Sequence, residues 1–537
     1  MVEYRLHGPP GTGKTRALAE SWVPRAAQRF GSDRVVICSL TRPAASEIAS
    51  RGIPIPEHNI GTLHALAFRA LGRPTIAEGK IDSWNEAEGA FQITGSGPSV
   101  DEPEIRSERG TRGDELSALA QVYRHRRIPR SQWRDDVLVF QNKWERWMGR
   151  EGLTDFTGLI EDALETVPTA PGDPAVFIVD EAQDSSTLEL DLVRKWASRA
   201  EDGAVLAGDG DQAIYGWRGA SARAFLTPEI PAENNYHLTK SYRVPRAVHA
   251  VASRWIEQAS YRYAVEYEPR DFEGLILESR GGVRNPFPIL QGAIEDMEAG
   301  KSVMILAACG FMLHGIIKAL RHEGVPFHNP YRPTHGGWNP LRGGGRRLGD
   351  YLRPDPSTYP STFRMWNWEE AKSWTDVIRA RESLATGGKA WIHRMSKDNE
   401  ERAKPIAPED GRVVFGDSWE ELQTAFAEGA PLPWLRERLL PSKRKLMEYA
   451  FTIAEKRGTL ALRNRPSITV GTIHSTKGGQ ADAVYLLPDL SASGMREFTK
   501  PGDGRDGIIR TFYVGMTRAK EKLVVGRRQS PCSLALR

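Results

Sequence analysis

The chain has 537 residues, of which 40% are hydrophobic and 26% charged, a composition typical of a globular protein with two to four domains. The formal net charge is only +4, so binding to nucleic acid would depend on local basic patches. No run of about eighteen apolar residues predicts a membrane span. The three cysteines share no metal-ligand spacing, which argues against zinc ribbons, iron–sulfur sites and a disulfide framework and fits a reducing cytoplasm.

The first predicted element is a strand at residues 2–6, which leads into a glycine-rich turn and then a helix. Gly8, Gly13, Lys14 and Thr15 fit the pattern G-x-x-x-x-G-K-[ST], in which backbone N–H groups surround a phosphate. We expect Lys14 to reach the β- and γ-phosphates and the hydroxyl of Thr15 to bind Mg²⁺. The flanking strand and helix argue against a surface turn without a ligand. The predicted phosphate-binding residues are Gly8, Pro9, Pro10, Gly11, Thr12, Gly13, Lys14 and Thr15.

Short apolar runs that end in polar residues recur between helical stretches, as in an α/β fold with parallel sheets. The first series comprises residues 34–41, 175–184 and 203–212. The second series lies near Ser302, Thr469, Tyr485 and Leu523. Ligands bind at the carboxyl ends of parallel strands, so the polar residues there are candidates for chemistry. Two series predict two nucleotide-fold domains.

Two stretches interrupt these series. Residues 71–171 are mostly polar with a helical pattern, and they include the basic run of residues 124–134. Residues 330–441 are rich in Gly, Pro and Trp, and residues 335–349 are expected to form a flexible basic loop. A basic run is most often a solvated face, so contact with DNA by either run stays an alternative.

Two adjacent carboxylates, Asp180 and Glu181, end the predicted strand in the segment "VDEAQD". Asp180 suits Mg²⁺, directly or through water, because this metal prefers hard oxygen ligands. Glu181 would accept a proton from, or orient, the water that attacks the γ-phosphate. Downstream of a phosphate-binding turn, the pair predicts hydrolysis of ATP.

The segment "GDGDQAIYGWRGA" follows the next predicted strand. The neutral amide of Gln212 is suited to contact both the γ-phosphate and the attacking water. Tyr215 and Trp217, expected to be exposed beside Arg218, would form a stacking platform for the bases of a single strand. The alternative is that Trp217 fills a core. Because Gln212 lies only five residues from Trp217, binding or hydrolysis of ATP at Gln212 would be coupled to contact between Trp217 and a DNA base.

These motifs resemble those of superfamily 1 helicases of the UvrD/Rep/PcrA class and occur in the order of that family. The segment at residues 39–51 is similar to the family's Ia segment. The remaining similar segments are residues 61–68, 152–164, 238–248, 471–487 and 510–525. The resemblance implies an α/β fold with two RecA-like motor domains, each carrying an inserted accessory domain.

The implied domain organisation follows from the positions of these motifs. Residues 1–70 and 172–245 would form the first motor domain, 1A, with residues 71–171 as a helical 1B-like insert. Residues 246–329 and 442–537 would form the second, 2A, with residues 330–441 as a reduced 2B-like insert.

The resemblance also implies roles for individual residues. Arg243 and Arg518 match the arginines that stabilise the γ-phosphate charge, and Arg16 and Tyr242 match residues that sandwich the adenine ring. The residues at the positions that contact the DNA backbone are Thr62, His64, Thr472 and His474.

The chain departs from the family pattern at several points. Leu63 stands where an aromatic residue is frequent, so a stacking contact is absent or moved to Phe68. Gln480 replaces a glutamate that touches the nucleotide sugar or an arginine, so hydrogen bonding survives without charge pairing. Only seven residues precede Gly8, leaving no place for the family's adenine-reading glutamine. We therefore expect GTP or dATP to support hydrolysis within roughly tenfold of ATP.

The sequence thus predicts an ATP-dependent DNA helicase that uses Mg²⁺-ATP, moves 3′ to 5′ and acts on single strands and single-strand/duplex junctions, with protein loading factors as possible partners. A translocase that displaces proteins from DNA or remodels it without strong unwinding is the alternative, because the 2B-like insert is short. A DNA-binding scaffold without catalysis is disfavoured by the intact ATP-site residues. The sequence predicts neither pathway nor oligomeric state.

Overall fold

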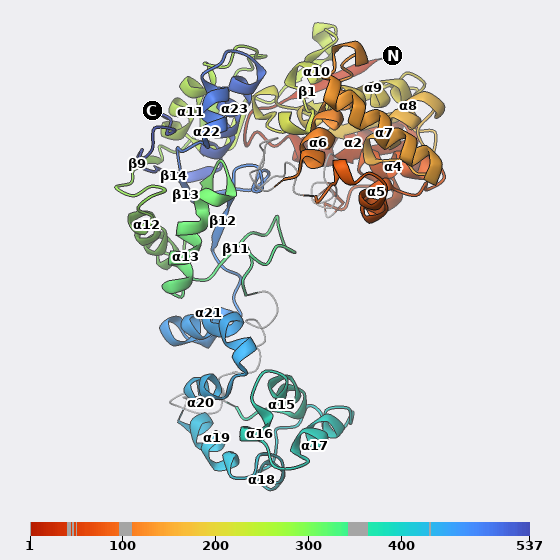
Figure 1. Cartoon of the computed structure of the whole chain (residues 1–537). Coiled ribbons are helices and arrows are strands. Elements are labelled where there is room, and N and C mark those ends of the chain that lie inside the picture. The colour runs from red at the N-terminus through yellow and green to blue at the C-terminus, as the bar shows by residue number, and fades with distance from the viewer. Residues whose placement is uncertain are drawn as a thin grey trace. The chain divides into compact units, whose positions relative to one another are not determined.

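The computed structural model describes residues 2–39, 45, 48, 49, 51–95, 110–341, 364–428 and 431–536. The chain divides into two compact units, shown in Figure 1. The first unit contains Met1–Arg284, Val303–Leu313 and Gly471–Arg537, and the second contains Asn285–Ser302 and His314–Val470. This division does not test the boundaries of the four predicted domains, which stay predictions. Within the described residues, no helix combines the length and the apolar composition needed to cross a membrane.

The first sheet has the strand order β3-β2-β4-β5-β1-β6. Its strands are β1 Glu3–His7, β2 Val35–Ser39, β3 Ile60–Gly61, β4 Val176–Asp180, β5 Ala204–Gly208 and β6 Asn235–His237. The pairings of β1 with β5 and β6, and of β2 with β3 and β4, are all parallel. Ser39 lies beside Asp180 and His7 beside Gly208, so the carboxyl ends of the strands share one edge of the sheet. The predicted parallel α/β fold is confirmed.

Helices cover both faces of this sheet (Figure 1). The helices of this region are α1 Lys14–Ala17, α2 Val23–Phe30, α4 Leu63–Ala70, α8 Phe156–Thr166, α9 Thr187–Ala197 and α10 Ala222–Leu226. Phe177 of β4 belongs to the core formed with α4, α8 and α9, whereas Ile178 belongs to the core formed with α2. Successive side chains of a strand point to opposite faces, so a buried run such as β4 needs helices on both sides.

The segment between β3 and β4 is helical, as predicted. Its further helices are α5 Ile81–Ala87, α6 Arg112–His125 and α7 Asp135–Glu151. They enclose an aromatic core in which Trp84, Phe140 and Trp147 are almost fully buried. The ring of Trp144 lies 4.9 Å from that of Trp147 and 5.0 Å from that of Trp84, so this insert has a core of its own.

Four strands of a second sheet lie in the first unit, in the order β10-β13-β14-β9. They are β9 Leu275–Glu278, β10 Val303–Ala307, β13 Ala481–Leu486 and β14 Ala519–Val525. Their pairings are parallel, which confirms the second predicted series. The accompanying elements are β7 Lys240–Pro245, β8 Glu268–Arg270, α11 Arg246–Ile256, α22 Ala492–Phe498 and α23 Asp503–Met516. Trp255 of α11 donates to the carbonyl of Ile509 in α23 at 2.8 Å.

The second unit is largely helical. Its helices are α12 Phe287–Glu298, α13 His314–His322, α15 Trp368–Thr375, α16 Ala380–Ser383, α17 Gly388–Met395, α18 Pro408–Phe415, α19 Ser418–Ala427, α20 Pro431–Arg438 and α21 Pro441–Arg457. Strand β11 Phe327–His328 pairs with the start of β12 Ile468–Thr472. Helices α15–α20 lie together in one group (Figure 1). Among them Trp366 and Trp374 are buried, and their stacked rings lie 5.4 Å apart. Of the predicted basic loop, residues 342–349 lie outside the described residues.

Candidate functional site

The phosphate-binding turn connects β1 to a helical segment that runs from Lys14 to Phe30. Gly11 and Gly13 have φ of 77° and 86°, a left-handed conformation that glycine adopts without steric cost. A Cβ on Gly11 would lie 2.5 Å from the Cβ of Arg243, so the turn also packs too closely for a larger residue. Lys14 is buried and its Nζ donates to the carbonyl of Gly8 at 2.6 Å. The ammonium is therefore held inside the turn in which the phosphates are predicted to lie.

The two predicted metal ligands meet at the ends of their elements. Thr15 Oγ1 donates to Asp180 Oδ2 at 2.7 Å. Burial, together with the neighbouring charge of Glu181, raises the pKa of Asp180 to about 7. Two hard oxygen donors, one of them a carboxylate beside a second acid, fit a divalent cation, and Mg²⁺ prefers such ligands. The residues present therefore suit the predicted Mg²⁺ site.

Glu181 has a constrained backbone and an ionised side chain. Its φ of 55° and ψ of 39° place a non-glycine residue in the left-handed region, a strain that clusters at functional sites. Burial opposes ionisation, but the charges of Lys14 and Lys477 hold the pKa of Glu181 below its usual value. Gln183 Nε2 donates to Glu181 Oε2 at 2.5 Å. An ionised, oriented carboxylate is suited to accept a proton from water.

The structure joins Gln212 to Arg518, although 306 residues separate them in sequence. Gln212 Nε2 donates to Asp209 Oδ2 at 2.7 Å, and Arg518 Nη2 donates to Gln212 Oε1 at 3.0 Å. Lys477 Nζ donates to the Gln212 carbonyl at 2.7 Å and to Asp184 Oδ1 at 2.6 Å. The amide predicted to sense the nucleotide is thus held by residues from both halves of the motor.

Arg243 lies beside the phosphate-binding turn. Its Nε donates to Gln480 Oε1 at 2.8 Å, so the neutral amide does keep the hydrogen bond expected at this position. Ser241 Oγ and Tyr267 OH both donate to the carbonyl of Pro10, at 2.9 and 3.0 Å. Strand β7 is therefore fastened to the turn, and contact of the Arg243 guanidinium with a γ-phosphate stays a prediction.

The predicted adenine sandwich lies at the surface. The side chain of Arg16 is 68% exposed and pairs with Glu20 at 2.8 Å, and Tyr242 is 71% exposed. The Tyr242 N–H donates to the carbonyl of Gly11 at 2.9 Å. Both side chains are thus open to a ligand, and their stacking on a base stays a prediction.

Several predicted DNA contacts are less accessible than expected. The expectation that Tyr215 is exposed is wrong, because it is only 9% exposed and its hydroxyl donates to the carbonyl of His474 at 3.2 Å. Thr472 and His474 are buried as well, at 0% and 6% exposure. The bond between Tyr215 and His474 joins segments 259 residues apart, which the linear order of the motifs does not reveal. Their contact with DNA is not tested.

Other predicted contacts do reach the surface. Trp217 is half-buried and Arg218 exposed, so Trp217 neither fills a core completely nor stands free. Thr62 caps α4 by accepting from the N–H of Ala65 at 3.2 Å. The ring of His64 lies 6.3 Å from the ring of Phe156. Sequence reasoning missed Phe156, which is 51% exposed and adds an aromatic surface near the position where Leu63 lacks one.

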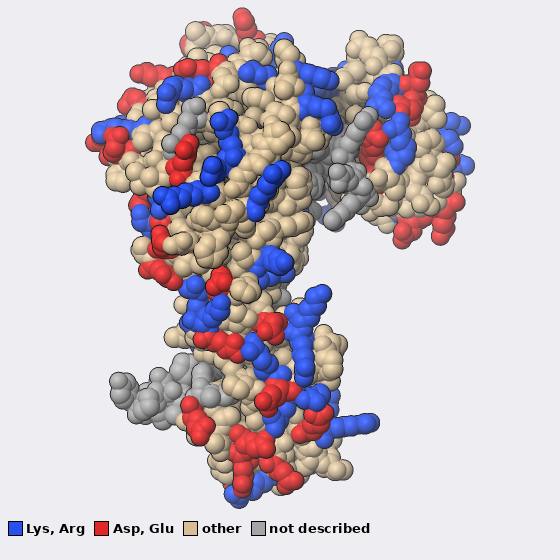
Figure 2. Space-filling model, turned by 60° about the vertical axis from the view of Figure 1, so that its left-hand side comes forward, with Lys and Arg blue, Asp and Glu red and all other residues tan. Residues whose placement is uncertain are grey.

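The basic run at residues 124–134 is paired with acids rather than free for phosphate. Arg124 is only 8% exposed and donates to Asp155 Oδ2 at 2.6 Å. Further ion pairs of the run include Arg127–Asp191, Arg130–Glu145 and Arg134–Asp136, whereas Arg126 donates to the carbonyl of Gly216. On the face drawn in Figure 2, basic and acidic side chains are likewise interspersed. The interpretation as a structural and solvated face is favoured over a DNA-contact patch.

Sequence reasoning also missed residues that support the site. Gln183 lies in the segment "VDEAQD" and Lys477 in the helicase-like segment 471–487. Their positions inside these motifs could have identified them. Tyr267 lies between motifs and reaches Pro10 only through folding, so no local pattern reveals it.

Comparisons with known proteins show what the chain is similar to. The model of the AAA domain family matches residues 4–218. The chain is 25% identical over 292 residues to a probable DNA helicase of Mycoplasma pneumoniae, covering 46% of this chain and 52% of that protein. It is 23% identical over 305 residues to the ATP-dependent DNA helicase PcrA of Leuconostoc citreum, covering 49% and 40%. A PcrA of Staphylococcus aureus is 30% identical over 135 residues, 24% and 18% of the two chains. The matched part thus spans about half, or less, of these relatives.

Proposed function

We propose that this chain, a relative of the superfamily 1 helicases of the UvrD/PcrA class, is an ATP-dependent DNA helicase that moves 3′ to 5′ on single-stranded DNA. The observation that carries the proposal is the bond between Gln212 and Arg518. This bond joins a residue that follows β5 of the first sheet to a residue that precedes β14 of the second. Trp217, five residues after Gln212, is half-buried at the surface. A change at the nucleotide can therefore move a surface that contacts DNA.

The phosphate chemistry follows from the positions of the side chains. The turn and Lys14 bind the phosphates, while Thr15 and Asp180 would hold Mg²⁺, which neutralises charge on the phosphate oxygens when bound. Glu181 orients the attacking water and takes its proton. Arg243 and Arg518 then stabilise the charge spread over the transferring phosphoryl group.

Movement along DNA follows from the change in these contacts during a cycle. Arg243 is held by Gln480, and Arg518 by Gln212, so binding of the γ-phosphate would redirect both guanidiniums. Hydrolysis would reverse this change. Alternating grip on the strand by the two motor halves would advance the protein by roughly one nucleotide per ATP.

The test is DNA-stimulated ATPase activity of the wild type and of Lys14→Ala. The variant should lose hydrolysis while keeping affinity for single strands, since Lys14 is buried in the turn and bonded to Gly8. A wild-type protein without DNA-stimulated hydrolysis contradicts the proposal. Equal loss of DNA binding in a folded Lys14→Ala protein contradicts the assignment of this residue to the nucleotide alone.

A second candidate function is displacement of proteins from DNA without strong unwinding. The small helical body formed by α15–α20 favours it, because it offers little surface for holding a duplex apart. Strand displacement and streptavidin displacement, measured on the same substrate with the same ATP, separate the two functions. Efficient streptavidin removal with negligible unwinding would favour the second.

A further inference from the structure

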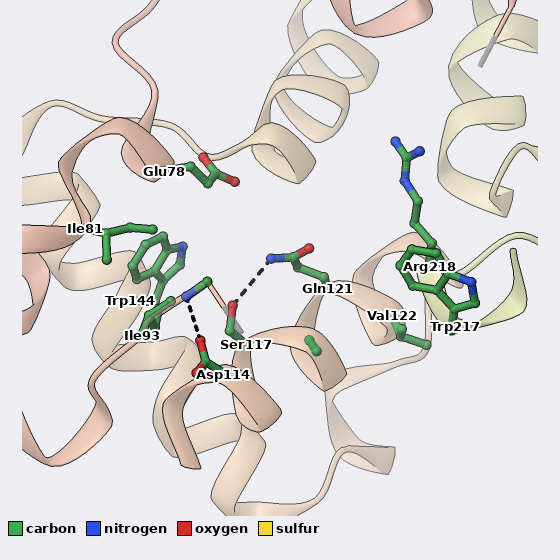
Figure 3. A pocket seen from close by; sticks show the side chains of 12 residues that line it. Glu78, Ile81, Ile93, Asp114, Ser117, Gln121, Val122, Trp144, Trp217 and Arg218 are labelled. Atoms are coloured by element: carbon green, nitrogen blue, oxygen red, sulfur yellow. Dashed lines mark hydrogen bonds between the residues drawn. The ribbon is translucent and has the colours of Figure 1, made fainter. Parts of the chain in front are cut away.

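A cavity of about 260 Å³ lies between the helical insert and the segment that carries Trp217. Figure 3 shows Glu78, Ile81 and Trp144 at one end, Trp217 and Arg218 at the other, and Gln121 between them. Two of these residues, Trp217 and Arg218, are predicted DNA contacts. None of the motifs that resemble helicases contains Glu78, Gln121 or Trp144.

Glu78, which lines this cavity, has one carboxylate oxygen without a partner among the described residues. Glu78 Oε1 accepts from the N–H of Phe156 at 3.0 Å. Its Oε2 is shielded from solvent without a hydrogen bond. A shielded acceptor without a donor costs free energy, so a ligand that supplies an N–H at this point would be stabilised.

The other walls suit a flat heterocycle. The ring of Trp144 is fixed because its Nε1 donates to Asp155 Oδ2 at 2.8 Å, and Ile81 lines the same end. Gln121 contributes an amide whose NH₂ group makes a long hydrogen bond, 3.4 Å to Ser117 Oγ. An aromatic wall, an apolar wall, one free acceptor and one adaptable amide are the elements of a nucleobase site.

We propose that this cavity, the Glu78 pocket, receives one base of the bound single strand and favours a base with an exocyclic amino group over thymine. The inference rests on the proposed function, because the strand must pass Trp217 and Arg218. An exocyclic amine projects an N–H toward Glu78 Oε2. Thymine carries a carbonyl oxygen on each side of its N3–H, so a carboxylate that accepts from this N–H would lie against the lone pairs of those oxygens.

Phe156 connects the pocket to the rest of the predicted strand path. Its N–H anchors Glu78, and its half-exposed ring lies 6.3 Å from the ring of His64. Phe156 thus links His64, a predicted DNA contact, to Glu78 of the pocket, and all three residues belong to the first unit. An extruded base can enter the pocket while its neighbours stack on exposed aromatic rings.

The experiment compares binding of dye-labelled (dC)15 and (dT)15 by fluorescence anisotropy without ATP. Both strands consist of pyrimidines, but cytosine carries an exocyclic amino group where thymine carries a carbonyl oxygen. The pH is 8, because burial raises the pKa of Glu78 to about 7. The wild type should bind (dC)15 about three- to tenfold more tightly, in the range of one hydrogen bond. Equal affinities overturn the inference, as does binding of free dCMP as tight as that of (dC)15.

Glu78→Gln provides the sharper readout. The Phe156 N–H holds the amide oxygen, which turns the NH₂ group into the pocket, so the preference should reverse toward (dT)15. Glu86→Gln removes an exposed charge from the same α5 region and should leave the ratio unchanged. If Glu78→Gln misfolds, Gln121→Trp fills the cavity from the exposed side and should abolish the preference. An unchanged ratio in a folded Glu78→Gln or Gln121→Trp protein overturns the inference.

The two proposals fail in different ways. Failure to bind either oligonucleotide contradicts both the pocket and the DNA-binding function. DNA-stimulated hydrolysis with equal binding of (dC)15 and (dT)15 contradicts only the pocket.

Discussion

Glu181 combines three features that rarely coincide in one residue: a left-handed backbone, a carboxylate kept ionised by Lys14 and Lys477, and a hydrogen bond from Gln183. Replacing Glu181 by Gln removes the proton acceptor but spares Asp180. We expect kcat for ATP to fall by two or more orders of magnitude, in line with loss of a general base, while ATP binding persists. Stopped-flow binding of a fluorescent ATP analogue beside steady-state turnover measures both. A variant that retains over half of wild-type kcat contradicts the role.

Gln480 tests how charge pairing at the edge of the site affects catalysis. It accepts from Arg243 Nε at 2.8 Å at an exposed position, where an ion pair contributes at most about 1 kcal/mol. Gln480→Glu would hold Arg243 more firmly away from the phosphate. We expect KM for ATP to rise up to about fivefold, with the increase shrinking as salt screens the pair. Steady-state kinetics at two ionic strengths check this, and an increase that is insensitive to salt contradicts the electrostatic cause.

At the scale of elements, the turn Gly216–Arg218 carries Trp217, which is half-buried. The turn follows Gln212 in the chain, and Trp217 lines the Glu78 pocket. Trp217→Ala should weaken binding of single strands by about 1–3 kcal/mol if a base stacks on the indole. A role in packing alone predicts a lower melting temperature with unchanged affinity per folded molecule. Thermal unfolding and anisotropy on one sample separate these results, and Trp217→Phe, which keeps an aromatic face, is the matched control.

How much of this could be predicted from the sequence depends on the range of the interaction. Strand β1 and the turn after it were predicted because buried runs, glycines and the Lys–Thr pair lie within fifteen residues. The burial of Tyr215 was not predicted, because it depends on the carbonyl of His474, 259 residues away. The pairing of Arg124 with Asp155 and the position of Glu78 beside Phe156 also require the folded insert. Motifs whose residues lie close together in the chain can be predicted from the sequence, whereas hydrogen-bond and ion-pair partners that only the fold brings together cannot.

At the scale of the whole molecule, Lys477 links the two parallel sheets. Its Nζ donates to Asp184 and to the carbonyl of Gln212, and both side chains of the ion pair are less than one tenth exposed. Removing one partner leaves a buried, unpaired charge, which costs about 3–5 kcal/mol. We therefore expect Lys477→Met to lower the free energy of unfolding by about 3 kcal/mol at pH 8, measured by urea denaturation.

The pH dependence identifies the charge as the cause. Burial raises the pKa of Asp184 to about 6, against the opposing charge of Lys477, and in Lys477→Met that pKa rises further. A carboxyl whose pKa is raised on folding binds more protons when folded, so its contribution to stability is lost as pH rises through the folded-state pKa. The deficit of Lys477→Met should therefore be smaller at pH 5 than at pH 8. Adding Asp184→Asn removes the unpaired charge and should recover most of the loss at pH 8. A deficit that is equal at both pH values and persists in the double variant would show that packing, rather than the buried charge, is what Lys477 supplies.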